Sequence, residues 1–535
     1  MKRFAFYPLC IGLFALLSVF ASNTEEASAR ELLVPAALVL TGTLAVLAVA
    51  GLAMRSVHRG ALFAAAFVFC FLTYGFWVDV LWAMHPEPAL RVAYHRAILV
   101  VQGLALIGIG YFVVRAKDPQ SLTPRLNRFS LILLACPVVI VLGRWISAGL
   151  RAAPSATATA DQSLLIAPLS KSAERPDIYF IVLDAHGRQD VLRDQYHYDD
   201  GPFLQHLRDK GFWIGDQTTS NYMWTELSVP ATLNMRYLND LPGEDVAARI
   251  RVAAQLHRNS ALVAELRTLG YRTVAFEALE KWLCLDNSDI YYSVSNQIGF
   301  TPLQQLLLDT SALSQFGGER IRSRLVLDQF HLKREMMLFK FATMPQVAAL
   351  KGPKFVFLHV MEPHTPFVFA ADGSDPGKRG YGSMFDGLND DITVAQYHDW
   401  YREQAIYTDN QAAIMIDRVL ARSAKPPVIV LIGDHGPRSG MTTDPTASDL
   451  HEYMGNLTAV YLPGKDNRGL YPQITPVNLF RVVLNDYFDA GLPMLPDKSY
   501  YSYPQQFPLR DVTAVVKPGA QTQPVATANM SEPTR

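Results

Sequence analysis

Residues 427–436 read Pro-Val-Ile-Val-Leu-Ile-Gly-Asp-His-Gly, a short apolar run that ends in an acid and a histidine between two glycines. Two other apolar runs are also followed by acidic residues or histidine. Residues 177–184 read Asp-Ile-Tyr-Phe-Ile-Val-Leu-Asp, and residues 354–364 read Lys-Phe-Val-Phe-Leu-His-Val-Met-Glu-Pro-His. Short runs rich in β-branched and aromatic residues are typical of buried strands in an α/β sheet. We therefore predict strands at 177–183, 354–360 and 427–433.

Helical patterns at 397–422 and 477–488 alternate with these strands, which indicates a mostly parallel sheet. Ligands bind at the carboxyl ends of strands in such sheets, so the polar residues after the three runs are expected to converge. Each has a simpler alternative: Asp184 as a turn residue or helix cap, and His364 as part of a proline-rich loop. The pair Asp434-His435 favours a metal site, because its flanking glycines allow the backbone to approach a ligand.

Residues 220–237 are rich in hydroxyl side chains. Pro230, within this segment, suits the first turn of a further helix, so hydroxyls lie just before the expected helix start. Counting back from Pro230 puts Ser228 nearest the cap position and Thr225 in the loop before it. Either hydroxyl can cap the helix. Either can also act as a nucleophile at a helix N-terminus, where the dipole favours an anion and a nearby metal lowers the hydroxyl pKa.

The first 150 residues differ in composition from the rest of the chain. They hold 18 of the 97 charged residues and carry a net charge of +6, against −7 for the other 385 residues. Five apolar stretches lie at 4–21, 32–54, 60–78, 97–114 and 129–150. Because about 18 or more apolar residues can cross a hydrocarbon core as a helix, we predict a transmembrane bundle of about five helices. Arg144, within the fifth stretch, must reach the interface or face another helix.

The basic residues flanking these stretches are unequally divided. Eight lie on one side (Lys2, Arg3, Arg55, Arg59, Arg115, Lys117, Arg125 and Arg128) and three on the other (Arg30, Arg91 and Arg96). By the positive-inside rule the eight are cytoplasmic, so an odd number of spans places the remaining chain outside. If the first stretch is instead a cleaved signal peptide, four spans starting outside give the same location.

The distribution of basic residues and cysteines excludes some partners and some kinds of site. No clustered basic stripe is present, so nucleic acid is excluded as a partner. Only Cys284 of the four cysteines lies outside the first 150 residues, which excludes a disulfide framework and a Cys-rich zinc site there. We predict a linker at 151–175, a catalytic domain at 176–510 and a disordered tail at 511–535.

Taken in order, these motifs resemble the alkaline phosphatase and sulfatase superfamily, in particular its membrane-anchored branch. That branch includes lipoteichoic acid synthases, lipid A phosphoethanolamine transferases and phosphoglycerol transferases. The matching pieces are the strand ending at Asp184 and the segments 225–230, 358–367, 407–409 and 432–436. The resemblance covers roughly residues 176–490. It implies an N-terminal transmembrane bundle followed by a sulfatase-like α/β domain with a mostly parallel central sheet.

The resemblance also implies a ligand set. Asp184, Thr225, Asp434 and His435 would hold one divalent metal ion, and Thr225 would also be the catalytic nucleophile. Oxygen-rich ligands with a single imidazole suit Mn²⁺, Mg²⁺ or Zn²⁺. In the family the histidine matching His364 contacts the substrate or, in some members, a second metal. The candidate substrate-binding residues are therefore His364, Trp224 and Arg438.

This sequence departs from parts of the branch. Lipoteichoic acid synthases and phosphoethanolamine transferases carry Glu at the position of Asp184, and the latter usually have disulfides that this chain cannot form. Neither Cys284 nor Ser228 lies in the Cys/Ser-x-Pro/Ala-x-Arg pattern from which sulfatases make formylglycine. The comparison thus favours an unmodified hydroxyl nucleophile and a phosphorus centre.

We therefore expect a multi-pass protein of the bacterial inner membrane with its catalytic domain outside the cytoplasm. It would transfer a phosphate-linked headgroup from a membrane lipid donor to a cell-envelope glycan or lipid through a phospho-threonine. One alternative is a phosphate or sulfate ester hydrolase, for which water is the preferred acceptor. The other is a non-catalytic membrane scaffold, which would bind no metal.

Overall fold

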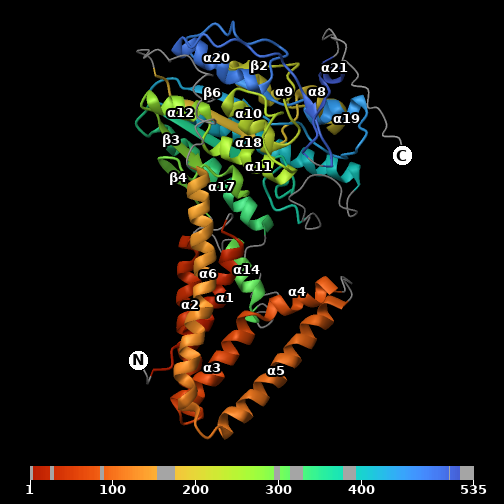
Figure 1. Cartoon of the computed structure of the whole chain (residues 1–535). Coiled ribbons are helices and arrows are strands. Elements are labelled where there is room, and N and C mark those ends of the chain that lie inside the picture. Colours follow the sequence, from red (N-terminus) through yellow and green to blue (C-terminus); the bar gives the residue numbers. More distant parts are fainter. Residues whose placement is uncertain are drawn as a thin grey trace, which may run out of the picture. The chain divides into compact units, whose positions relative to one another are not determined.

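The computed structural model describes residues 4–24, 29–84, 90–152, 175–294, 302–313, 329–377, 393–504 and 506–517 (Figure 1). The chain forms two compact units. Unit 1 comprises Met1–Thr159 and Ser295–Asp328, and unit 2 comprises Ala160–Val294 and Gln329–Arg535. Most of the predicted linker, and the predicted tail beyond residue 517, lie outside the described residues.

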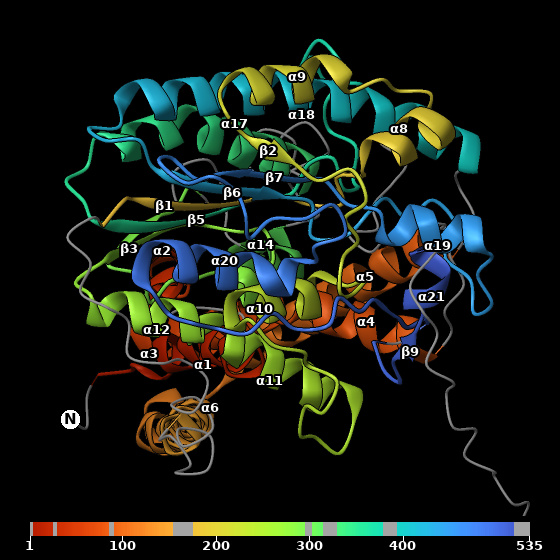
Figure 2. The same ribbon diagram turned by 90° about the horizontal axis from the view of Figure 1, so that it is seen from above.

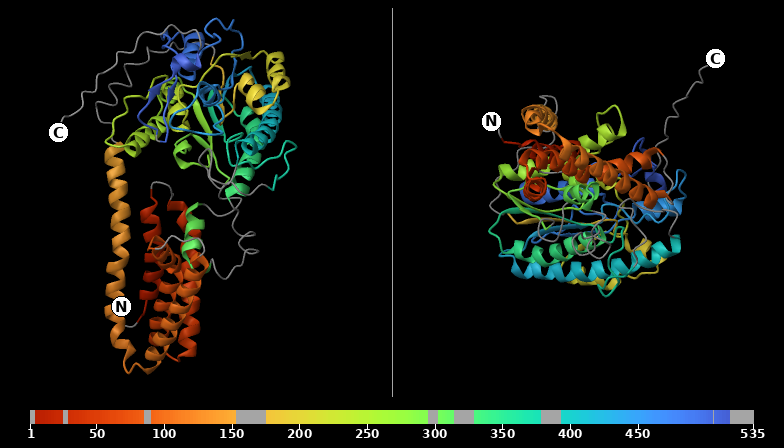
Figure 3. Two further views of the ribbon diagram at one scale, coloured as in Figure 1. Left: turned by 90° about the vertical axis from the view of Figure 1, so that its right-hand side faces the viewer. Right: turned by 90° about the horizontal axis from the view of Figure 1, so that it is seen from below.

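Unit 1 is helical (Figure 3). Its elements are α1 (Tyr7–Ser22), η1 (Ala29–Leu32), α2 (Leu33–Ala53), α3 (Val57–Leu72), α4 (Tyr74–Met84), α5 (Arg91–Arg115), η3 (Pro119–Leu122), α6 (Thr123–Ala152) and α14 (Pro302–Thr310).

Among the residues that the structure describes, fewer helices than the predicted five are long and apolar enough to span a membrane. Three helical stretches, Leu33–Ala53, Ala93–Arg115 and Pro119–Ser147, are long and apolar enough to cross a membrane, and α3 with α4 make a fourth if the pair counts as one span. That pair bends by 46° at Thr73. The first predicted span is α1, which has only 16 residues. At 1.5 Å per residue it is about 24 Å long, short of a hydrocarbon core of about 30 Å.

Unit 2 is an α/β domain. In chain order its elements are β1 (Ile178–Leu183), α8 (Gln189–Tyr196), α9 (Gly201–Asp209), β2 (Trp213–Ile214), α10 (Thr225–Asn234), α11 (Val246–Arg258), α12 (Ala261–Thr268), β3 (Arg272–Phe276), η4 (Lys281–Leu283), β4 (Ile290–Tyr292), α17 (Gln329–Ala348), β5 (Lys354–Val360), α18 (Val394–Arg422), β6 (Val428–Ile432), α19 (Ala447–Met454), β7 (Thr458–Tyr461), α20 (Pro476–Phe488), β8 (Tyr500–Tyr501), β9 (Arg510–Asp511) and α21 (Thr513–Val516).

The central sheet has the strand order β2-β7-β6-β1-β5-β3-β4. Strands β6, β1, β5, β3 and β4 run parallel, whereas β7 is antiparallel to β6 and β2 is antiparallel to β7. The predicted mostly parallel sheet is therefore confirmed. The three strands predicted from sequence are its three central neighbours, with Leu183 of β1 beside Val360 of β5 and Val182 of β1 beside Ile432 of β6.

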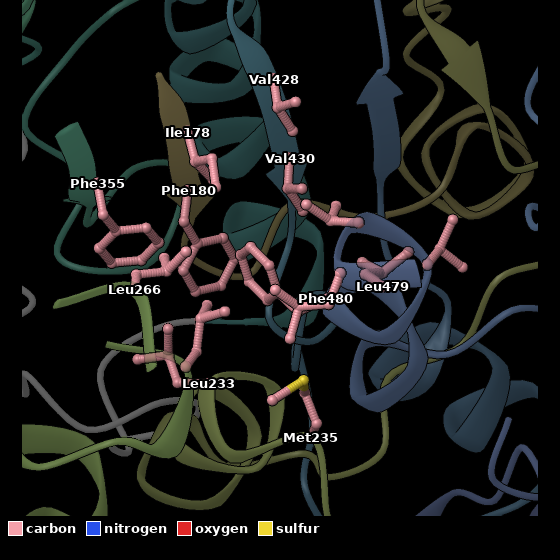
Figure 4. Close-up of a cluster of buried hydrophobic side chains, with 14 of the residues drawn as sticks. Ile178, Phe180, Leu233, Met235, Leu266, Phe355, Val428, Val430, Leu479 and Phe480 are labelled. Atoms are coloured by element: carbon pink, nitrogen blue, oxygen red, sulfur yellow. The ribbon is translucent and has the colours of Figure 1, made fainter. Parts of the chain in front are cut away.

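Helices cover both faces of this sheet. Figure 2 shows α17, α18 and α9 on one face and α10, α12 and α20 on the other. Every residue of β1 is buried, which explains why its apolar run does not alternate with polar residues. On the α10 side, Phe180 of β1 packs edge to face on Phe480 of α20 at the centre of a large apolar cluster (Figure 4). This packing fixes the strand ends that carry the polar residues.

Candidate metal site and nucleophile

The three central strands bring their following residues to one edge of the sheet. Asp184 directly follows β1, and its N–H donates to the carbonyl of Val360 at the end of β5 (2.9 Å). Asp434 lies two residues after β6, on the other side of β1. The N–H of His364 in turn donates to the carbonyl of Asp184 (3.1 Å). Backbone hydrogen bonds therefore connect two of the three predicted strand endings.

Three of the predicted site residues lie around the imidazole of a fourth, His435. Nε2 of His435 lies 3.5 Å from Oδ1 of Asp184, 3.5 Å from Oδ2 of Asp434 and 3.2 Å from Oγ1 of Thr225. Asp184, Asp434 and His435 form a buried group whose ligand atoms lie within 4.8 Å of one another. The structure thus brings together the four residues that the resemblance implies as metal ligands.

The second oxygen of each carboxylate and the second ring nitrogen of His435 contact neighbouring protein groups. Oδ1 of Asp434 accepts the N–H of Ala185 (3.1 Å), and Oδ2 of Asp184 lies 3.1 Å from Nε2 of His359. Nδ1 of His435 lies 2.9 Å from the carbonyl of Gly436, which favours the tautomer with its proton on Nδ1 and a bare Nε2.

Oδ1 of Asp184 and Oδ2 of Asp434 are buried and have no hydrogen-bond partner among the residues that the structure describes. Buried carboxylate oxygens without a partner are costly unless an ion neutralises them. Two carboxylate oxygens, one imidazole nitrogen and one hydroxyl therefore fit a divalent metal ion.

Electrostatics favour the ionised form of Asp184. Burial by itself raises the pKa of this carboxyl, but the adjacent His364 and the contacts with His359 and His435 outweigh burial and hold the pKa well below its usual range. The group is therefore an anion at neutral pH, as a metal ligand must be.

The backbone around the ligands is tightly packed. A Cβ on Gly433 would lie 2.2 Å from the carbonyl oxygen of His186, and one on Gly436 would lie 2.0 Å from that of Glu452. The glycines that flank Asp434 and His435 are thus required for close approach to other backbone segments, rather than to a ligand as the sequence suggested. Ala185 has a φ of +60°, an unfavourable value for a residue with a side chain, and it places its N–H on Asp434.

The helix after the hydroxyl-rich segment begins earlier than predicted. Thr225 is the first residue of α10, Trp224 is its N-cap, and Pro230 lies inside the helix. Ser228 is consequently not a cap: its hydroxyl donates to the carbonyl of Asp434 (2.6 Å). Thr225 places its hydroxyl at the positive end of the helix dipole, where an anion is favoured.

The three predicted substrate-binding residues lie together. The guanidinium of Arg438 stacks on the ring of Trp224 at 4.8 Å and donates to the carbonyl of Met223. Its Nη2 lies 3.3 Å from Nε2 of His364. The rings of His364 and His435 are 6.2 Å apart between centroids. Arg438 thus contacts the two residues that directly precede the candidate nucleophile Thr225 in the sequence.

Sequence reasoning missed the residues that hold the His364 segment. Lys333 on α17 is fully buried, and its Nζ donates to the carbonyls of His364 (2.6 Å) and Pro366 (2.9 Å). Gln404 on α18 also donates to the His364 carbonyl (2.9 Å). Buried lysine is rare and cannot be recognised from a single sequence, and no helix was predicted over 329–348.

A buried acid lies beside this lysine. Glu362 is fully buried, its carboxylate is 3.7 Å from Nζ of Lys333, and neither of its oxygens has a hydrogen-bond partner among the described residues. Burial raises the pKa of Glu362, and Lys333 and Lys340 only partly oppose this. Burial also lowers the pKa of Lys340 to about 8, although Glu362 opposes it.

The acid of the matched 407–409 segment is not part of the group of candidate metal ligands. Asp409 lies 2.7 Å from Nε2 of His186, in the loop after β1, and also accepts the hydroxyl of Tyr198 (2.6 Å). Both His186 and Asp409 are buried. Their pairing links α18 to the loop after β1, which is a structural role.

Comparison with known proteins identifies the family of the chain. The family model for sulfatases matches residues 176–482, and the chain belongs to the sulfatase family. The predicted superfamily is thus confirmed. Comparison with curated protein sequences finds no match.

Several solved structures are similar in fold. The C-terminal periplasmic domain of EptC from Escherichia coli is 12% identical, with a TM-score of 0.41, over 65% of this chain and 96% of that one. The integral membrane lipooligosaccharide phosphoethanolamine transferase EptA from Neisseria meningitidis is 14% identical, with a TM-score of 0.36, over 90% of this chain and 94% of that one. Similarities this low do not assign a substrate to the chain.

Proposed function

We propose that this membrane protein is a metal-dependent phospho-transferase. It moves a phosphate-linked headgroup from a membrane lipid to a hydroxyl of a cell-envelope glycan or lipid. The observation that carries the proposal is the position of the Thr225 hydroxyl, at the first residue of α10 and 3.2 Å from Nε2 of His435. Membership of the sulfatase family and the apolar N-terminal helices support it.

Thr225 is the nucleophile in this proposal, and Asp184, Asp434 and His435 complete the ligand set. A divalent ion bound there, Mn²⁺, Mg²⁺ or Zn²⁺, would lower the pKa of the hydroxyl and offset the charge on the phosphoryl oxygens. Oδ1 of Asp434 accepts the N–H of Ala185, and Nδ1 of His435 donates to the carbonyl of Gly436. These hydrogen bonds orient the two side chains before any ligand arrives.

The reaction then consists of two in-line displacements. In the first, Oγ1 of Thr225 forms a bond to the donor phosphorus and loses its proton, while the bond from phosphorus to the lipid oxygen breaks and that oxygen gains a proton. In the second, the oxygen of an acceptor hydroxyl forms a bond to phosphorus and loses its proton, while the bond from phosphorus to Oγ1 breaks. Oγ1 gains a proton, which regenerates Thr225. No oxidant or further co-reactant is needed.

Arg438, Trp224 and His364 bind the substrate in this scheme. Arg438 is buried, and its partners Met223 and Trp224 hold it in one orientation. A fixed guanidinium favours a phosphodiester anion, because it offers charge and several N–H donors in one plane. His364 accepts from this guanidinium and so sets its direction.

The remaining parts of the chain have corresponding roles. Residues 176–510 supply the catalytic domain, which we place outside the cytoplasm of a bacterial inner membrane on the strength of the basic-residue bias. The linker at 151–175 would keep that domain close to the bilayer surface, where the lipid donor lies.

Mass spectrometry of the intact protein tests the proposal. The full-length chain, purified in detergent and incubated with bacterial phospholipids and Mn²⁺, is expected to carry an adduct on Thr225 whose mass identifies the transferred group. Thr225→Ala should carry none, whereas Thr225→Ser, which keeps a hydroxyl, should regain it. An adduct on Ser228, or none on any residue while the donor is consumed, would contradict the proposal. Release of free headgroup despite a glycan acceptor would indicate an ester hydrolase.

A further inference from the structure

One segment that lies between catalytic-domain strands in the sequence belongs to the helical unit. The polypeptide leaves unit 2 after Val294 and returns to it at Gln329, and the residues between them are part of unit 1. The structure describes residues 302–313 of this excursion, which contain α14. The predicted catalytic domain at 176–510 gave no reason to expect this.

Apolar side chains on α14 pack on the helical bundle. Leu303, which is buried, and Leu307 join a cluster with Phe20 in the last turn of α1 and Val141 of α6. Nε2 of Gln304 donates to the carbonyl of Glu31 in η1 (3.2 Å). Figure 1 shows α14 beside α1.

The residues after α14 continue the contact. Ala312 is buried with Tyr74 and Val78 of α4, and its N–H donates to the carbonyl of Phe71 at the end of α3 (2.7 Å). Two hydrogen bonds and two apolar clusters therefore attach this segment to one end of the bundle. It is the end where α1 finishes, opposite the N-terminus of that helix.

Two leucines of the segment are not covered by the bundle. Leu306 is 38% exposed and Leu313 is 49% exposed. The helix on which Ala312 packs, α4, also carries exposed aromatic residues, namely Phe76 (56%) and Trp77 (42%). Exposed apolar side chains on membrane-spanning helices face acyl chains, and aromatic residues concentrate at the membrane interface.

We infer that residues 302–313 form an interfacial membrane element, in which Leu306 and Leu313 insert into the bilayer. The chain of unit 2 is then attached to the membrane at two separate positions, α6 and this segment. If the proposed function is correct, the second attachment limits how far the nucleophile can move from the lipid headgroups. The membrane contact itself does not depend on that function.

Spin-label accessibility tests this inference in the full-length protein. Cys70 and Cys136 are replaced by alanine, whereas the buried Cys10 and Cys284 stay, and the protein without added cysteine measures their background labelling. A nitroxide is attached at Leu306→Cys or Leu313→Cys, and the protein is reconstituted in phosphatidylcholine vesicles. Collision rates with molecular oxygen, which concentrates in lipid, and with a water-soluble nickel chelate are then compared.

Two matched positions calibrate the measurement. Leu104 on α5 is 64% exposed and should report lipid, and Ile414 on α18 of unit 2 is 43% exposed and should report water. We expect labels at 306 and 313 to collide more with oxygen than with nickel, as at 104. A pattern like that of Ile414, or loss of collisions with both reagents, would overturn the inference. The latter would mean that protein covers the leucines.

Cross-linking separately tests the docking. Ala312→Cys with Phe71→Cys, in the same cysteine-reduced background, should form a disulfide under copper phenanthroline, because their backbones are hydrogen-bonded at 2.7 Å. Leu306→Cys with Phe71→Cys is the control and should not. Failure of the first pair in a folded protein would contradict the docking. Neither readout uses enzymatic activity, so a failure of the proposed function would remain distinguishable.

Discussion

Replacing Lys333 by methionine should separate its role in stability from its role in the site. Lys333→Met removes the donor to two buried carbonyls and the nearest positive charge to Glu362, 3.7 Å away. Breaking a buried ion pair by removing one partner costs about 3–5 kcal/mol, because the remaining charge loses its nearest partner. Lys340, whose charge also acts on Glu362, places the expected cost toward the lower end of that range. We therefore expect a clear drop in the thermal midpoint of the full-length protein, measured by intrinsic fluorescence in detergent.

The converse change should cost less. In Glu362→Gln, the Lys333 ammonium keeps its carbonyl acceptors at 2.6 and 2.9 Å, whereas in Lys333→Met the Glu362 oxygens keep no hydrogen-bond partner among the described residues. The loss in Lys333→Met should also shrink as the pH falls. The pKa of Glu362 is raised by burial, so protonation at lower pH removes the charge that lacks a partner.

The double variant Lys333→Met with Glu362→Gln distinguishes the two roles. Removing both charges should restore most of the stability, since replacing a whole buried pair is often close to neutral. Turnover should stay about tenfold or more below wild type, because His364 loses one of the donors that fix its carbonyl. Metal content should not change. Recovery of turnover together with stability would show that Lys333 acts on the fold alone, and a cost below about 1 kcal/mol for Lys333→Met would refute the ion-pair argument.

Three further predictions concern the metal, pH and topology. Asp434→Asn and His435→Ala should each lower the metal content of the purified protein measured by atomic emission, and full occupancy in both would mean that these residues are structural. Burial and the nearby Asp409 raise the pKa of Asp200 to about 7. The folded state then holds a proton that the unfolded state has lost, so wild-type stability falls as pH rises from about 4 to about 7. At pH 8, Asp200→Asn should raise the thermal midpoint, and the free energy of unfolding should rise by up to about 4 kcal/mol. Near pH 4 the substitution should have little effect. An equal effect at both pH values would exclude this titration. An alkaline phosphatase reporter fused after Leu150 should be active and one fused near Pro119 inactive, and the reverse would place the catalytic domain in the cytoplasm.

The sequence by itself determined the sulfatase-like α/β fold and pointed to the candidate metal ligands that the structure brings together. Buried parallel strands must be apolar along their whole length, so β1, β5 and β6 were visible as uninterrupted runs. The residues after such strands meet at one sheet edge, and a ligand pair such as Asp434-His435 is adjacent in the chain. The apolar runs and the residues that follow them are both local features of the sequence, so they can be read without knowing how the chain packs.

Only the tertiary structure decided where α10 begins and which residues support the site. The preference of proline for a first helical turn placed the helix start near Pro230, but it begins at Thr225, and Ser228 inside it bonds to Asp434 instead of capping. Local preferences of about 1 kcal/mol are readily outweighed by such buried contacts.

The same holds for long-range partners. Lys333 reaches His364 from a helix 31 positions earlier in the chain, and nothing in a lysine's sequence context shows that it is buried. The leucines of α14 have the pattern of any amphipathic helix, so the sequence could not show that they pack on membrane helices rather than on the sheet. In both cases the physical cause is a contact between distant segments, which exists only once the chain has folded.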